Sequence, residues 1–161
     1  IYVAASIIAF LLSAPAMAQS PHGNIHGAWG VRCNTATGAH AACQIYQNIV
    51  VTESRKPILH FAIGFTEDAK TAVGIFVVPL GIYLPPGVTL QVDDGQIYEL
   101  PIDMCAEKGC RVRFSFDDNL LNIFRRGETA KITFAGGDRK PIVIPVSLKG
   151  FTAALKDLKL P

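Results

Sequence analysis

Residues 110–116 read Cys-Arg-Val-Arg-Phe-Ser-Phe, and this alternation of apolar and polar side chains decides the fold class. Val112, Phe114 and Phe116 fall on one face of an extended chain, and the polar residues between them fall on the other. A strand with one buried face and one solvated face requires this pattern. The segment therefore predicts a half-buried strand of an antiparallel sheet.

Other short segments rich in β-branched and aromatic residues surround it, separated by turn residues. The expected strands cover residues 28–33, 43–52, 58–65, 88–92, 96–100, 130–135 and 142–148. The apolar run at 73–84 predicts either one strand buried on both faces or two strands that meet at a bend near Pro79 and Gly81. Pro-Pro-Gly at 85–87 predicts a turn, and Asp-Asp-Gly at 93–95 predicts a hairpin.

Two short helices are expected to interrupt the β pattern. In residues 117–127, an aspartate can cap the first turn and Gly127 can end the helix. In residues 151–158, apolar side chains recur at helical spacing, at Phe151, Ala154, Leu155 and Leu158. We expect this stripe to cover one end of the core, membrane attachment being the alternative. The whole pattern predicts an all-β domain, a β-sandwich or small antiparallel barrel with two short helices.

The N-terminal residues predict export. Residues 3–12 form an apolar run, and an A-x-A cleavage pattern follows at residues 16–18. The run is shorter than the about 20 residues that a transmembrane helix needs. We therefore expect a cleavable signal peptide at 1–18, rather than a buried N-terminal helix. A flexible arm at 19–27 and a single β domain at 28–161 would follow, without a transmembrane segment in the mature chain.

Four cysteines, Cys33, Cys43, Cys105 and Cys110, allow three disulfide connectivities. Their spacing favours two local pairs, Cys33 with Cys43 and Cys105 with Cys110. The alternative is a zinc site, but the nine residues between the first two cysteines do not suit a zinc knuckle. In the oxidising compartment that export implies, we expect disulfides.

The sequence lacks the familiar local motifs of catalytic and metal sites. No nucleophile elbow, zinc-protease helix, phosphate loop or dinucleotide glycine pattern occurs, so we expect no catalytic residue, cofactor or metal site. His22 and His26 would meet only in a helix, which the nearby proline and glycine disfavour. His40 is expected in the loop between the first two cysteines, and His60 on a strand face beside a hydrogen-bonding partner.

Two pairs of adjacent carboxylates are explained by turn and capping chemistry. Asp93 and Asp94 fall in the expected hairpin turn, and Asp117 and Asp118 at the expected helix start. Neither pair offers the regularly alternating oxygens of a calcium loop. The alternative hypothesis is a small periplasmic enzyme that acts on envelope polysaccharide, with Asp93, Asp94 or Asp117 as acids.

The net charge of +2 is unevenly distributed. Residues 19–100 carry four Lys/Arg and six Asp/Glu, a net charge of −2, whereas residues 101–161 carry eleven and seven, a net charge of +4. Two differently solvated faces would explain this difference. The alternative is a weakly basic surface for an anionic partner such as lipid headgroups or polysaccharide. The basic residues are too sparse for a nucleic-acid-binding protein.

Several short segments also stand in a recognisable order along the chain. They are Trp-Gly-Val-Arg-Cys at 29–33, Cys-Gln-Ile at 43–45, Leu-Pro-Pro-Gly-Val at 84–88, Leu-Pro at 100–101, Cys105, Gly-Cys at 109–110, Gly-Phe at 150–151 and Ala-Leu at 154–155. As an ordered set, they resemble the invasion-associated locus B family of proteobacterial envelope proteins. The resemblance covers almost the whole of the expected mature chain.

The resemblance implies an exported protein, named for association with host-cell invasion and virulence but widespread in bacteria without hosts. It supplies no catalytic residue, and it carries over the four cysteines as disulfide positions. It also implies that Trp29 packs over the core near the Cys33 bridge. Our leading hypothesis is a non-enzymatic periplasmic or outer-membrane-associated protein that binds another envelope or host-surface component.

Overall fold

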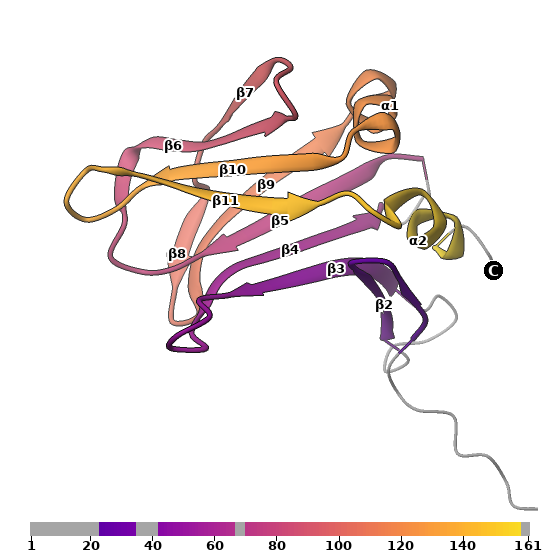
Figure 1. The fold of residues 1–161 in the computed structure, drawn as a ribbon, viewed down its shortest axis with the longest axis horizontal. Coiled ribbons are helices and arrows are strands. Elements are labelled where there is room, and N and C mark those ends of the chain that lie inside the picture. Colours follow the sequence, from indigo (N-terminus) through magenta and orange to yellow (C-terminus); the bar gives the residue numbers. More distant parts are fainter. Residues whose placement is uncertain (1–22, 35–41, 67–69, 159–161) are drawn as a thin grey trace, which may run out of the picture.

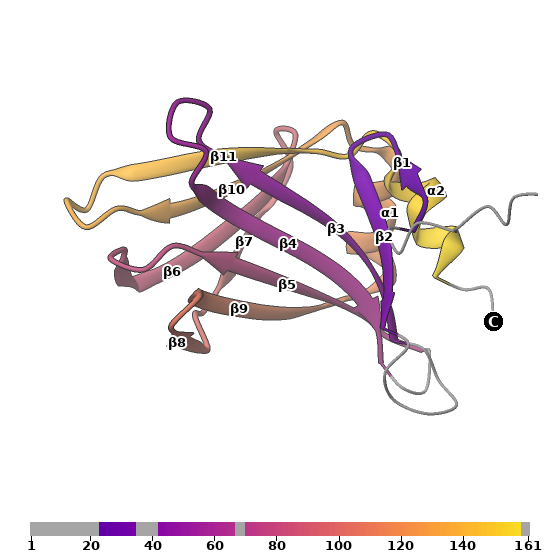
Figure 2. The same cartoon turned by 90° about the horizontal axis from the view of Figure 1, so that it is seen from below.

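The computed structural model describes residues 23–34, 42–66 and 70–158, which form two sheets and two short helices. Figures 1 and 2 show the sheets packed face to face, with both helices at one end of the sandwich. The predicted all-β class with two helices is confirmed. Neither helix in this part of the chain has the length and apolar composition that crossing a bilayer requires.

The sheets contain seven and four strands, and every pair of neighbouring strands is antiparallel. In spatial order, the larger sheet contains β1 (Ile25–His26), β2 (Trp29–Asn34), β3 (Ala42–Val50), β4 (Pro57–Phe65), β5 (Ala72–Val78), β9 (Gly109–Phe116) and β8 (Met104–Ala106). The smaller sheet contains β11 (Pro141–Ser147), β10 (Thr129–Ala135), β6 (Tyr83–Val92) and β7 (Ile97–Leu100).

The alternating segment at 110–116 lies in β9, as predicted. Val112, Phe114 and Phe116 are buried between the sheets, whereas Arg111 and Arg113 are exposed on the outer face. The apolar side chains therefore supply one wall of the core. The alternation predicted both the strand and the face that it buries.

The apolar run at 73–84 contains two strands rather than one. β5 ends at Val78, the chain bends over residues 79–82, and β6 begins at Tyr83 in the other sheet. Of the two alternatives, the bend near Pro79 is the one that the structure contains. The continuous apolar composition reflects the passage of the chain from one sheet to the other, since both strands border the core.

The turn predicted at 85–87 is wrong, because β6 continues through these residues as a bulged strand. Against β10, Val88 is paired with Phe134 but Tyr83 is paired with Ala135, so residues 84–87 bulge out of the ladder. Gly87 has φ +71°, and a Cβ there would lie 2.5 Å from the Leu100 carbonyl oxygen. The two prolines are tolerated because a bulge does not require their N–H groups.

The predicted flexible arm at 19–27 also requires correction. The structure describes its residues from 23 onward, and Ile25 and His26 pair with β2 as β1. The His26 ring and the Asn24 amide both bond the carboxylate of Asp157. This contact joins positions more than 130 residues apart, so no local pattern could have predicted it. The expected signal peptide at 1–18 lies outside the described residues.

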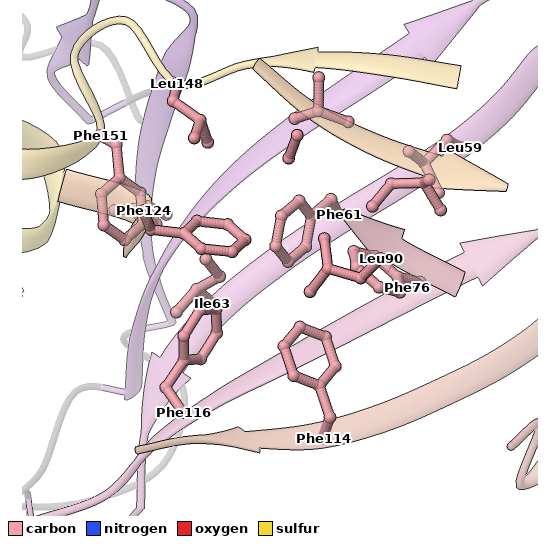
Figure 3. Packing of buried hydrophobic residues seen from close by; sticks show 14 of the residues in the cluster. Leu59, Phe61, Ile63, Phe76, Leu90, Phe114, Phe116, Phe124, Leu148 and Phe151 are labelled. Atoms are coloured by element: carbon pink, nitrogen blue, oxygen red, sulfur yellow. The ribbon is translucent and has the colours of Figure 1, made fainter. Parts of the chain in front are cut away.

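The core is dominated by aromatic rings. The Phe61 centroid lies 4.4 Å from that of Phe76, 5.4 Å from that of Trp29 and 6.2 Å from that of Phe124. Figure 3 shows Phe61, Phe76 and Phe124, with further apolar side chains, filling the space between the sheets. Trp29 also donates its indole N–H to the Ser147 carbonyl oxygen across the sandwich, at 3.1 Å. The rings therefore fill the core, and the Trp29 hydrogen bond links the larger sheet to β11 of the smaller one.

The helices α1 (Asp118–Arg126) and α2 (Phe151–Asp157) close one end of this core. The Asp117 carboxylate caps α1 by accepting the Leu120 N–H at 2.7 Å, and Gly127 ends the helix, as predicted. In α2, the predicted apolar stripe is buried in the core by Phe151, Ala154 and Leu155. The expectation that this stripe packs on the sheets is confirmed.

Candidate functional site

Both disulfides link residues that face each other on neighbouring strands. Cys33 on β2 is bonded to Cys43 on β3, and Cys105 on β8 is bonded to Cys110 on β9. Among the described residues, no cysteine is free. Since β8 is an edge strand and β2 is followed only by the short β1, each disulfide links a strand at one margin of the larger sheet to the next strand inward. Their position indicates a structural role.

Replacing Cys33 and Cys43 together by alanine should lower the free energy of unfolding by about 3 kcal/mol, and replacing Cys105 and Cys110 by about 2 kcal/mol. The reason is chain entropy: the bridged residues are 10 and 5 positions apart, and the shorter loop restricts the unfolded chain less. Urea unfolding of oxidised protein measures both losses. Equal stability of both variants and the oxidised wild type would contradict this assignment.

The histidines do not form a common site. His26 Nε2 lies 2.6 Å from Asp157 Oδ2, and His60 Nδ1 lies 2.6 Å from Asn48 Oδ1, on a strand face as expected. His22 and His40 lie outside the described residues. Within the described ranges, no group of three or more His, Cys, Asp or Glu side chains is arranged to hold a metal ion.

His60 should make stability depend on pH. Burial beside its neighbours, and then the positive charge of Arg32, hold the pKa of His60 below its ordinary value of 6.5. The His60 ring therefore binds a proton more readily in the unfolded chain than in the folded one. As a result, the free energy of unfolding should fall as the pH drops through about 6.5, and it should level off below the folded-state pKa. A His60→Gln variant should lose this part of the pH dependence.

Urea unfolding at about pH 7.5 and about pH 5.5 tests the His60 prediction, because these values bracket the unfolded-state pKa. The wild type should lose more stability between the two values than His60→Gln does. The same loss in both proteins would show that other groups cause the pH dependence.

The carboxylates proposed as acids of a polysaccharide-acting enzyme have structural partners. Asp93 accepts the backbone N–H groups of Glu128 and Thr129, Asp94 pairs with Lys131 at 3.0 Å, and Asp117 caps α1. The capping interpretation of Asp117 is confirmed. Asp93 joins the β6–β7 turn to the start of β10, which is a tertiary contact. These roles explain all three carboxylates without catalysis.

An open cleft of about 690 Å³ is formed by segments that lie at the end of the sandwich away from the helices (Figure 1). It is lined by the β6 bulge at residues 84–87 and by residues 99–105, which end β7 and lead into β8. Three prolines in this lining make part of the wall rigid, so little conformational entropy is lost when a ligand contacts it. Leu84 and Met104 are each 46% exposed at its rim. The cleft is therefore a preformed, largely apolar surface.

The charged side chains of the cleft lining are two carboxylates, Glu99 and Asp103. The Arg111 guanidinium donates two hydrogen bonds to Asp103, at 2.9 and 3.0 Å. These bonds hold the pKa of Asp103 below its ordinary value. Glu99 forms no ion pair with any residue that the structure describes. The cleft therefore presents one uncompensated negative charge beside its apolar wall.

A smaller hollow of about 310 Å³ lies on the other side of the β6 bulge, and Pro86 and Gly87 line both depressions. Its wall includes the Tyr83 ring, over which the Arg139 guanidinium lies at 4.8 Å from the ring centroid. The bulge thus borders both depressions.

The basic residues of the C-terminal half do not gather on one element. They are distributed over β9, α1, β10, α2 and the connecting turns, and Arg111, Lys131 and Lys140 are engaged in ion pairs. A surface for an anionic partner therefore stays a prediction. The cleft, of about 690 Å³, is larger than the hollow of about 310 Å³ beside it.

Comparison with known proteins identifies the family. The family model for the invasion associated locus B protein matches residues 29–159. The chain belongs to the invasion-associated locus B family. Within this family, it is 28% identical over 153 residues to invasion protein B of Bartonella bacilliformis, an alignment that covers 89% of this chain and 81% of the relative.

Two further proteins are similar to this chain over most of its length. An invasion protein B homolog of Brucella abortus is 26% identical over 151 residues, covering 93% of this chain and 86% of the relative. The crystal structure of invasion associated protein B from Bartonella henselae matches this fold with a TM-score of 0.75 and 27% identity, over 84% of this chain and 92% of the other. The predicted family resemblance is confirmed.

Segments that carried the resemblance to the invasion-associated locus B family meet at the cleft. Leu-Pro-Pro-Gly at 84–87, Leu-Pro at 100–101 and Cys105 all contribute to its lining. Trp29, with Gly-Phe at 150–151, lies instead at the helical end, where the indole packs on Phe151. The sequence alone did not predict the cleft, because its two walls come from separate segments. The available signal was the concentration of prolines beside apolar residues in both.

Proposed function

We propose that this chain is an exported, non-enzymatic binding protein of the bacterial envelope, and that its cleft binds another envelope or host-surface component. The observation that carries the proposal is the convergence of three family segments on one preformed apolar recess. Two carboxylates are the titratable groups of its lining, and Arg111 neutralises one of them. Recesses with apolar walls and few polar groups are typical of binding sites.

Export is supported by the A-x-A pattern at residues 16–18 and by two disulfides, which persist in oxidising compartments. We expect a periplasmic or outer-membrane-associated protein with a signal peptide at 1–18 and a domain at 28–161. N-terminal sequencing of protein isolated from the envelope should begin at Gln19. Recovery of a chain that retains residues 1–18 would contradict the export part of the proposal.

The binding proposal is tested with variants of exposed apolar residues. Leu84→Asp and Met104→Asp each place a charge at the rim of the cleft, and Val143→Asp places the same charge on β11, outside the cleft lining. The three side chains are 46%, 46% and 54% exposed, so each substitution should leave folding nearly unchanged. Val143→Asp is thus a matched control.

Each variant and the wild type serve as bait for envelope extracts of the producing bacterium, followed by mass spectrometry. A component retained by the wild type and by Val143→Asp should fall by at least about tenfold with Leu84→Asp and Met104→Asp, a loss of about 1.4 kcal/mol in binding. Retention of the same components by all four proteins would refute the cleft as the binding site.

A further inference from the structure

The two edges of the four-stranded sheet differ in their capacity to pair with another strand. On β11, the hydrogen bonds from Gly136 N to Lys140 O and from Leu148 N to Glu128 O fix which residues bond β10. In an antiparallel ladder, the alternate residues direct their N–H and C=O groups outward. The outward residues of β11 are therefore Pro141, Val143, Pro145 and Ser147.

The β11 edge is poorly suited to pairing. Pro141 and Pro145 have no N–H group, so two of its four outward donors are missing. The Ser147 carbonyl oxygen already accepts hydrogen bonds from Trp29 Nε1 and Gln47 Nε2, at 3.1 and 2.6 Å. Proline on an edge strand prevents edge-to-edge association. This side of the sheet is therefore blocked.

The β7 edge is open. The bond from Asp93 N to Thr129 O shows that the odd-numbered residues of β6 bond β10, so Val88 and Leu90 bond β7. Their partners are Leu100 and Tyr98. Ile97 and Glu99 consequently direct their N–H and C=O groups away from the sheet. In the part of the chain that the structure describes, β7 pairs only with β6, and no backbone–backbone hydrogen bond of a turn, loop or cap reaches these four groups.

The surroundings of this edge indicate what would pair with it. Ile97 is 57% exposed, and β7 leads directly into the cleft, whose lining includes Glu99 and Leu100. Alternating donors and acceptors at strand spacing are matched by the backbone of another extended chain. The apolar wall favours apolar side chains in that chain, and the unpaired Glu99 carboxylate favours a lysine or arginine.

We propose that an extended peptide segment of a partner protein adds to β7 as a fifth strand of the smaller sheet. Its backbone bonds Ile97 and Glu99, apolar side chains enter the cleft, and a basic side chain faces Glu99. This inference rests on the proposed binding function of the cleft and specifies its partner. A second copy of this chain is an alternative occupant that the experiment tests.

The test uses Ile97→Pro and Glu99→Pro, each of which removes one outward N–H group without removing a bond to β6. The molecule itself carries prolines at the corresponding outward positions of β11, so the fold should accept them. Val143→Pro removes an outward N–H group from the blocked edge and is the matched control. A displayed library of random 12-residue peptides, selected on the wild-type protein, supplies the probe.

Selected peptides should carry apolar residues at alternate positions and a basic residue. They should bind Ile97→Pro and Glu99→Pro about tenfold more weakly than the wild type, since a buried acceptor loses its donor, while Val143→Pro binds as the wild type does. In the wild type, they should slow hydrogen exchange at the amides of Ile97 and Glu99. This exchange measurement does not depend on the folding of any variant.

Three results would overturn the proposal: equal binding to all the proline variants, failure to enrich peptides, or self-association of the wild type that Ile97→Pro abolishes. The envelope experiment separates this proposal from the proposed function. Capture that is lost with Leu84→Asp but kept with Ile97→Pro would retain the cleft as a binding site and refute strand addition. Capture unaffected by either substitution would refute both.

Discussion

Replacing Trp29 by alanine should lower the free energy of unfolding by about 3–5 kcal/mol, the usual cost of removing a buried tryptophan. Trp29 is fully buried, and its ring centroid lies 5.4 Å from that of Phe61 and 5.5 Å from that of Phe151, both edge-on. The substitution would also leave the Ser147 carbonyl oxygen without its indole donor. It therefore removes apolar contacts with a strand and a helix at once.

Urea unfolding followed by circular dichroism measures the loss at Trp29, because the chain contains one tryptophan and its fluorescence disappears with the substitution. Trp29→Phe is the control: it keeps a ring in the core but lacks the indole N–H, so its loss should be smaller. The exposed Ile25→Ala, on the neighbouring strand, should change stability by less than about 0.5 kcal/mol. A similarly small loss for Trp29→Ala would refute its role in the core.

The second large effect is expected at the C-terminal helix, where Phe151→Ala should cost about 3–5 kcal/mol and Leu155→Ala about 2–5 kcal/mol. Phe151 is 1% exposed and Leu155 is 2% exposed. The Phe151 ring also lies 5.4 Å from that of Phe124 on α1, so it joins the two helices. A helix of seven residues is not stable in water without such packing.

Urea unfolding of both variants checks the helix prediction, with the exposed Ala153→Ser as the control within α2. A double-mutant cycle that combines Phe151→Ala with Trp29→Ala should give a coupling energy of about 0.5–3 kcal/mol, since the Phe151 and Trp29 rings are in contact. Losses below about 0.5 kcal/mol for Phe151→Ala and Leu155→Ala would assign their side chains to a surface instead of the core.

Local sequence patterns predicted most of the fold. The alternation in β9 identified both the strand and its buried face, because side-chain direction follows directly from strand geometry. The capped helix at 117–127 was equally predictable, since its start at Asp117 and its end at Gly127 depend on neighbouring residues. These elements require no knowledge of the rest of the chain.

The features that were missed depend on tertiary contacts. Pro-Pro-Gly at 85–87 has the composition of a turn, yet pairing of the flanking residues with β10 keeps it within a strand as a bulge. The strands β1 and β8, which pair with β2 and β9, were missed because strands of two and three residues carry no periodic signal. The cleft was missed because its two walls, the bulge at 84–87 and residues 99–105, meet only in the folded chain.

The contact between β1 and α2 has a consequence for chain connectivity. Asn24 donates to Asp157 at 3.2 Å, so the first and last parts of the described domain lie side by side at the helical end of the sandwich (Figure 2). A short linker from residue 158 to residue 23 can close the domain into a ring, and the exposed turn at residues 137–139 offers a place to reopen it. Such a circular permutant would place both new ends where the β10–β11 turn now lies, while every strand keeps its neighbours.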